Sequence, residues 1–223
     1  MNTLASFQLA YEQGADGVEL DVHLSKDGHI VIVHDFTLDA STDGRGEVAS
    51  HSLAELKRLD AGGWFSADFA GERIPTLDEV FDAFADKLYF NVELKSQFDD
   101  RPHLEAAVAE CIRSHGVSEQ TIVSSFDPRL LQEFRANCPD IMMGYLHVPG
   151  RSTALMDEVS HEARHPWHDA IDEAYMRWAR DAGYLVNAWT VNDAERACAL
   201  RDLGVNGIIT DSPAATISAL NQC

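Results

Sequence analysis

Short apolar runs rich in β-branched residues alternate along this chain with longer amphipathic runs. The short runs have the length and composition of buried strands. The longer runs repeat apolar residues every three to four positions, which is typical of helices that cover a sheet. The sequence predicts strands at 17–23, 88–94, 121–125, 142–146, 185–190 and 207–211, with a weaker one at 164–167. It predicts helices at 76–86, 104–115, 128–137, 171–182, 194–203 and 213–220.

This alternation indicates a parallel sheet with crossover helices. Seven expected strands, each followed by a helix, are one short of a (β/α)₈ TIM barrel, and 223 residues come close to the about 250 of that fold. A doubly wound open sheet is the alternative, but the chain has no glycine-rich phosphate fingerprint. No linker interrupts the pattern, so we expect a single barrel domain over residues 1–223.

The first predicted element is a helix rather than a strand. An N-cap at Asn2-Thr3 and a closing glycine at Gly14 bound an amphipathic run with no strand before it. In a barrel, every helix follows a strand. We therefore expect the first β-strand of the barrel to be missing from this chain.

Charge and hydropathy narrow the range of partners. The chain has 17 basic and 37 acidic residues, a net charge of −20 that disfavours nucleic acid and anionic membrane surfaces. No apolar run reaches the roughly 18 residues of a membrane-spanning helix, and no signal peptide is visible. These features favour a cytoplasmic protein with a small-molecule substrate, and they leave the choice of oligomeric state open.

The four cysteines, Cys111, Cys138, Cys198 and Cys223, are far apart in sequence and form no C-x-x-C motif. Cys111 and Cys198 lie inside apolar helical patterns. We expect reduced core thiols rather than disulfides.

Glu19 and Asp21 stand two residues apart in the predicted strand 17–23, so both side chains point to one face. Two carboxylates on one face of a buried strand are costly unless a cation or protons intervene. A solvent-facing edge strand would remove that cost. The apolar neighbours argue against it, because central parallel strands are buried on both faces.

A tight turn follows this strand. Asp27-Gly28 is a strong signal for a two-residue hairpin loop. In that register Lys26 pairs with His29, and Asp21 lies opposite His34. The hairpin would then bring a histidine beside the carboxylates, at the end of the barrel where active sites lie.

A second polar strand has the order Asn91-Val92-Glu93-Leu94-Lys95, which places Glu93 and Lys95 on one face. With Glu19 and Asp21, Glu93 completes an all-oxygen site suited to Mg²⁺ or Ca²⁺. A lysine beside such a site would hold a phosphate oxygen, and a histidine would move a proton. The spacing therefore indicates phosphoester chemistry; a purely structural ion pair between Glu93 and Lys95 is the alternative.

Several motifs, in this order and spacing, resemble the glycerophosphodiester phosphodiesterase family over essentially the whole chain. They are N-T-L-A-S-F, G-A-D-G-V-E-L-D-V-H-L-S-K-D-G-H-I-V-I-V-H-D, L-D-A-G-G-W-F, F-A-G-E-R-I-P-T-L-D-E-V, N-V-E-L-K, S-S-F-D, V-N-A-W-T-V-N and G-I-I-T-D. The resemblance implies a (β/α)₈ barrel that hydrolyses glycerophosphodiesters to sn-glycerol 3-phosphate and an alcohol.

The resemblance also implies roles for individual residues. Glu19, Asp21 and Glu93 match the metal ligands, and His34 matches one of two catalytic histidines. Lys95 matches a phosphate-binding position. The other two matches lie in aromatic segments: Trp189 near the glycerol end of the substrate and Phe126 at the mouth of the site.

One departure from the family is serious. Its members open with a strand that ends in His-Arg-Gly, followed by Pro-Glu-Asn-Thr, whereas this sequence starts at Met1-Asn2-Thr3. The absent histidine is a catalytic partner, so we expect impaired activity, explained by a misplaced start or by a genuine seven-stranded variant. A catalytically inactive barrel that binds a phosphorylated ligand and a different phosphodiesterase, such as a lysophospholipase D, are the alternative functions.

Overall fold

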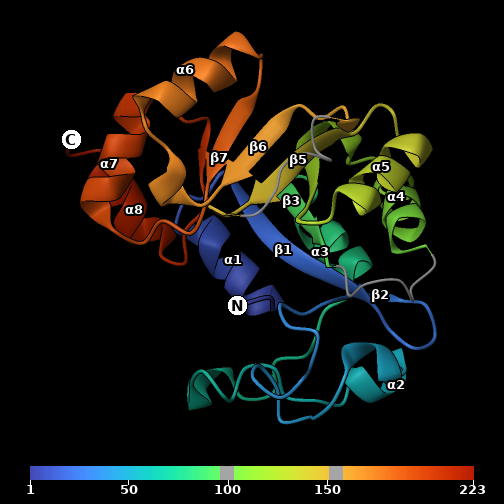
Figure 1. The fold of residues 1–223 in the computed structure, drawn as a ribbon. Coiled ribbons are helices and arrows are strands. Elements are labelled where there is room, and N and C mark those ends of the chain that lie inside the picture. The colour runs from blue at the N-terminus through green and yellow to red at the C-terminus, as the bar shows by residue number, and fades with distance from the viewer. Residues whose placement is uncertain (96–102, 151–157) are drawn as a thin grey trace.

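The computed structural model describes residues 1–95, 103–150 and 158–223. Its sheet has eight strands in the order β2-β1-β3-β4-β5-β6-β7-β8. Every neighbouring pair from β1 to β8 is parallel, and β2 is antiparallel to β1. Helices alternate with the parallel strands along the chain, as Figure 1 shows. The α/β alternation expected from the hydrophobic pattern is confirmed.

The element bounds lie close to those that the sequence predicts. The strands are β1 (Gly17–Leu24), β2 (Ile30–Ile32), β3 (Tyr89–Leu94), β4 (Thr121–Ser125), β5 (Met142–His147), β6 (Ala163–Pro166), β7 (Leu185–Ala188) and β8 (Gly207–Ile208). The helices are α1 (Leu4–Glu12), α2 (Leu53–Leu56), α3 (Leu77–Phe84), α4 (Leu104–Ser114), α5 (Pro128–Asn137), α6 (Glu173–Asp181), α7 (Ala194–Leu203) and α8 (Pro213–Leu220).

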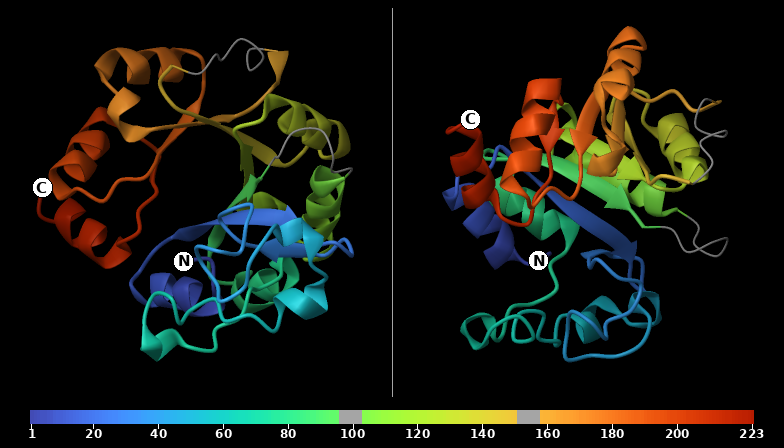
Figure 2. Two further views of the ribbon diagram at one scale, coloured as in Figure 1. Left: turned by 60° about the horizontal axis from the view of Figure 1, so that its bottom comes forward. Right: turned by 60° about the vertical axis from the view of Figure 1, so that its left-hand side comes forward.

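The sheet curls into a TIM-barrel-like arrangement with the helices on its outer side (Figure 2). The strand order ends at β8, and within the described residues β8 pairs with β7 but not with β1. The curled sheet is therefore open between β8 and β1. Helix α1 is capped by Thr3, whose side chain accepts a hydrogen bond from the backbone N–H of Ser6.

The β1–β2 hairpin has a different register from the predicted one. Val22 pairs with Ile32 and Leu24 with Ile30, which places Asp21 opposite Val33 instead of His34. The reason is the loop: Ser25 and His29 close it through a backbone hydrogen bond, so three residues make the turn. Gly28 has a φ of 84°, as three-residue loops require at their last position. The extra loop residue shifts the register by one.

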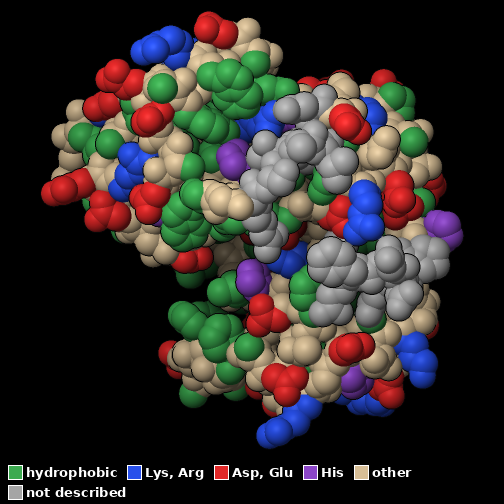
Figure 3. Space-filling model, viewed as in Figure 1, with side chains coloured by type: hydrophobic (Ala, Val, Ile, Leu, Met, Phe, Trp, Pro, Cys, Tyr) green, Lys and Arg blue, Asp and Glu red, His purple; other side chains and the backbone are tan. Residues whose placement is uncertain are grey.

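A long connection from β2 to α3 forms a small lobe beside the barrel. Its own buried cluster consists of Val31, Val33, Leu38, Val48, Leu56, Ala61 and Ile74. Figure 3 shows this lobe below a hollow in the surface, with hydrophobic side chains on both sides of the hollow. Trp64 and Phe65 belong to the lobe, and 45% and 68% of their surface is exposed.

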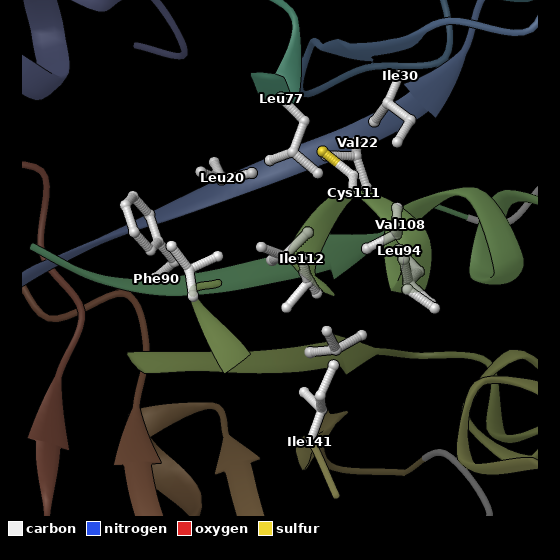
Figure 4. Close-up of a cluster of buried hydrophobic side chains, with 14 of the residues drawn as sticks. Leu20, Val22, Ile30, Leu77, Phe90, Leu94, Val108, Cys111, Ile112 and Ile141 are labelled. Atoms are coloured by element: carbon white, nitrogen blue, oxygen red, sulfur yellow. The ribbon is translucent and has the colours of Figure 1, made fainter. Parts of the chain in front are cut away.

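The main core fills the space between the sheet and helices α3, α4 and α5. Residues such as Leu20, Leu77, Phe90 and Ile112 come from both layers and are almost completely buried (Figure 4). Burial of side chains of this size stabilises a fold by about 1.5–3 kcal/mol each. A second cluster joins α6, α7 and β7. The main core holds in place β1 and β3, the strands that bear Glu19, Asp21 and Glu93.

The expectation of four reduced cysteines is wrong for one pair. Cys198 and Cys223 form a disulfide with their Cα atoms 6.2 Å apart, whereas Cys111 and Cys138 are free and buried. Helix α8 packs against α7, which returns the end of the described chain to Cys198. The pairing depends on this helix packing, which the sequence spacing of the cysteines does not reveal.

Candidate active site

Three carboxylates meet at the sheet. Glu19 and Asp21 lie on β1, Glu93 lies on the parallel neighbour β3, and Asp21 is the register partner of Glu93. One oxygen from each lies within 4.8 Å of the others. The period-2 geometry of the strands and the parallel register bring the three together, as the sequence predicts.

Lys95 follows β3 and binds two of these carboxylates. Its Nζ lies 3.1 Å from Oδ1 of Asp21 and 3.0 Å from Oε1 of Glu93. The lysine side chain is only 11% exposed, and Asp21 and Glu93 are buried. Asn2 donates a further hydrogen bond from Nδ2 to Oδ2 of Asp21 at 2.7 Å.

The charges of this cluster are incompletely balanced. Burial raises the pKa of Glu19 well above its usual range, and Asp21 and Glu93 raise it further. Burial also raises the pKa of Glu93 to about 7, although Lys95 opposes that shift. Burial lowers the pKa of Lys95, but Asp21 and Glu93 outweigh it and the net shift is upward. One ammonium thus leaves excess negative charge, which a divalent cation would neutralise.

His34 lies just past β2, at the rim of the cluster. Among the groups that act on the pKa of Glu93, His34 lowers it, with a smaller effect than that of Lys95. Nδ1 of His34 is 2.7 Å from Oδ1 of Asp35, and its side chain is 55% exposed. The histidine also lines a small pocket with Asn2 and Thr42. An exposed imidazole held by a carboxylate is suited to exchanging a proton with a ligand.

Two further predicted residues form an aromatic pair. Phe126 follows β4 and Trp189 follows β7, and their rings are edge-to-face with centroids 5.4 Å apart. Trp167, after β6, contacts Trp189 in the same way at 5.3 Å. The carboxyl ends of parallel strands lie at one end of the curled sheet. These rings therefore lie at the same end as Lys95.

A buried histidine network is the main feature that the sequence does not reveal. His165 on β6 is fully buried, its Nε2 is 3.0 Å from Nδ2 of Asn187, and its Nδ1 is 3.5 Å from Nδ2 of Asn91. Its backbone carbonyl accepts a hydrogen bond from Nε1 of Trp189. Gly144 leaves room for the ring, since a Cβ there would lie 2.5 Å from Nε2. The hydrogen bond to the His165 carbonyl holds the indole ring of Trp189 in position.

A curled parallel sheet with carboxylates and a lysine toward the carboxyl ends of its strands is the arrangement found in enzymes with the TIM-barrel fold. The family model of the glycerophosphoryl diester phosphodiesterases matches residues 1–215. A glycerophosphodiester phosphodiesterase of Caldanaerobacter subterraneus is 38% identical, over 99% of this chain and 92% of the relative. One from Bacillus subtilis is 30% identical, over 95% of this chain and 79% of the relative.

Solved structures of phosphodiesterases are similar to this chain in fold. A phosphodiesterase of Oleispira antarctica in complex with the product sn-glycerol-3-phosphate has a TM-score of 0.90 and 35% identity, over 99% of this chain and 91% of that one. A glycerophosphodiester phosphodiesterase of Agrobacterium tumefaciens has a TM-score of 0.81 and 29% identity, over 97% and 93%. The chain belongs to the glycerophosphoryl diester phosphodiesterase family, a family of phosphoric diester hydrolases.

The lengths and apolar character of the helices bear on membrane insertion. Among the helices of the described residues, none combines the length and the apolar character that crossing a bilayer requires.

Proposed function

We propose that this protein hydrolyses glycerophosphodiesters to sn-glycerol 3-phosphate and an alcohol, with Mg²⁺ or Ca²⁺ as its cofactor. The observation that carries the proposal is the cluster of Glu19, Asp21 and Glu93 in contact with Lys95. Membership of the family and the product-bound Oleispira relative supply the substrate class.

The donor set fits a hard divalent cation. Three carboxylates offer only oxygen, which Mg²⁺ and Ca²⁺ prefer. The raised pKa values of Glu19 and Glu93 arise from burial and mutual repulsion, so a cation would relieve an existing cost. Glu19, Asp21 and Glu93 would hold the ion, which when bound polarises a phosphoryl oxygen and stabilises charge that develops on it.

The side chains around the carboxylates have complementary tasks. Lys95 carries a positive charge at the strand end and would bind a second phosphate oxygen. His34, in its protonated form and held by Asp35, would donate a proton to the leaving alkoxide. Trp189 and Phe126 would form the apolar wall against the carbon atoms of the glycerol.

The test is identification of products from a panel of substrates. Purified protein with Mg²⁺ or Ca²⁺ is incubated with glycerophosphocholine, glycerophosphoethanolamine and lysophosphatidylcholine, and glycerol 3-phosphate and the free alcohols are quantified. The proposal predicts equal amounts of glycerol 3-phosphate and alcohol from the glycerophosphodiesters. Turnover of lysophosphatidylcholine alone would assign a lysophospholipase D instead. Binding of glycerol 3-phosphate without any turnover would assign a non-catalytic binding barrel.

A further inference from the structure

A second group of metal-binding side chains lies between helices α3 and α4. Nε2 of His115 is 3.7 Å from Oδ1 of Asp78 and 3.5 Å from Oδ1 of Asp82. Sγ of Cys111 lies 3.6 Å from the same oxygen of Asp78. Asp78, Cys111 and His115 each place one ligand atom within 4.8 Å of the others. None of these residues belongs to the strand-end cluster of Glu19, Asp21 and Glu93.

The spacing along the helices explains the convergence. Asp78 and Asp82 are four residues apart on α3, and Cys111 and His115 are four residues apart across the end of α4. Residues at this spacing project from one face of a helix. The two helices pack on the same core, to which both Leu77 and Cys111 belong (Figure 4). Each helix thus presents two donors to the other.

The orientation of His115 suits a metal ligand. Its Nδ1 is 2.9 Å from the backbone carbonyl of Cys111, so the N–H at Nδ1 donates to that oxygen. Nε2 faces the two aspartates, 3.7 Å from Asp78 and 3.5 Å from Asp82. A carbonyl that fixes the tautomer from behind is a common feature of metal-binding histidines. The ring of Phe81 packs on His115 with centroids 5.5 Å apart.

We propose that Asp78, Cys111 and His115 form a Zn²⁺ site that is separate from the active site, with Asp82 beside it. Metal bonds of about 2.0–2.3 Å in a tetrahedron imply ligand separations of about 3.3–3.7 Å. Nε2 of His115 and Sγ of Cys111 lie 3.7 and 3.6 Å from Oδ1 of Asp78, close to this range, and Sγ of Cys111 lies 3.8 Å from Nδ1 of His115. Mixed nitrogen, sulfur and oxygen donors select Zn²⁺ over Mg²⁺ or Ca²⁺.

The competing explanation is a simple ion pair between a protonated His115 and two aspartates. The aspartate side chains are 62% and 76% exposed, and exposed pairs contribute little stability. That explanation needs no thiol. Sulfur ligation by Cys111, whose Sγ lies 3.6 Å from Oδ1 of Asp78, is therefore the property that separates the two explanations.

The experiment is a titration of the metal-free full chain with Co²⁺, which reports thiolate ligation by a charge-transfer band in the near ultraviolet. No added thiol is present, which keeps the Cys198–Cys223 disulfide intact. We expect one equivalent of Co²⁺ to give this band with the visible spectrum of a tetrahedral site, and Zn²⁺ to displace it. The strand-end cluster of carboxylates has no sulfur and cannot give the band.

Matched variants make the result specific. Cys111→Ser should abolish the charge-transfer band, whereas Cys138→Ser, which changes the other free cysteine, should retain it. His115→Ala should weaken Co²⁺ binding by roughly 10- to 100-fold or more. Circular dichroism checks that each variant is folded. A spectrum without the band at saturating Co²⁺, or a band that persists in folded Cys111→Ser, would overturn the proposal. Hydrolase activity plays no part in this readout.

Discussion

At the scale of single residues, the strand-end carboxylates are unfavourable together without a cation. Glu93 has a pKa of about 7 in the folded protein because of its burial. The folded state therefore holds a proton more tightly than the unfolded chain between about pH 4.5 and 7. Stability in this window falls as the pH rises, since the folded state must release a proton that the unfolded state has already lost. Glu19 shifts in the same direction.

The first prediction concerns this pH dependence. Without metal, Glu93→Gln should remove a cost on the order of 3 kcal/mol at pH 8 and change much less at pH 5. Urea unfolding at both pH values measures the difference, with the exposed Glu133→Gln as control. Equal pH dependence in wild type and Glu93→Gln would show that Glu93 does not titrate as described.

The second prediction concerns His34. His34→Ala should lower kcat for glycerophosphocholine hydrolysis by roughly 10²- to 10⁴-fold, because one proton donor is removed. His29→Ala is the matched control: His29 lies on the same hairpin, pairs with Asp27 and has a 52% exposed side chain. It should leave kcat within about twofold of wild type, as is usual for a surface substitution away from the reacting groups. Equal losses in both variants would remove His34 from the mechanism.

At the scale of elements, the hydrophobic pattern predicts the seven parallel strands because most residues of β1 and of β3 to β6 are buried. Strands β7 and β8 are less buried. It places Asp21 near Glu93 because both occupy polar positions on successive strands of the expected parallel sheet. The hairpin register could not be predicted reliably, because Asp27-Gly28 suits both a two-residue loop and the observed three-residue loop. The choice depends on Ser25 closing the loop through His29, an interaction that has no distinct sequence signal.

The third prediction concerns the link between α7 and α8. The disulfide joins residues 25 positions apart, and closing a loop of this size stabilises a fold by about 3 kcal/mol. Cys223→Ser should lower the free energy of unfolding by this amount. Adding reductant to wild type should have the same effect, while the variant should not respond further. A wild type that is insensitive to reductant would contradict the assignment of the bond.

At the scale of the whole molecule, the network around His165 connects β3, β6 and β7, and it brings together residues far apart in the sequence. No local pattern predicts such contacts, because each partner alone looks like an ordinary strand residue. The carboxylate cluster was easier to predict because its residues lie on adjacent strands with regular spacing.

The fourth prediction follows from His165 and His147, whose pKa values are lowered by burial. Burial lowers the pKa of His165 to about 3 and that of His147 to about 4. Both stay neutral in the fold, while the unfolded chain takes up protons below about pH 6.5. Stability should therefore fall as the pH drops from 6.5 to 3. Unfolding in urea with saturating Mg²⁺ measures this fall, and His147→Gln should reduce it. An unchanged acid profile in His147→Gln would rule out its contribution.

The central claim is that Glu19, Asp21 and Glu93 hold the catalytic cation. Its most direct test is reconstitution of chelated protein with Mg²⁺ or Ca²⁺ while glycerol 3-phosphate release from glycerophosphocholine is followed. Wild type should regain activity with added metal, and folded Glu19→Ala should stay inactive at metal concentrations that saturate the wild type. Undiminished activity in Glu19→Ala, or full activity of the chelated wild type, would contradict the claim.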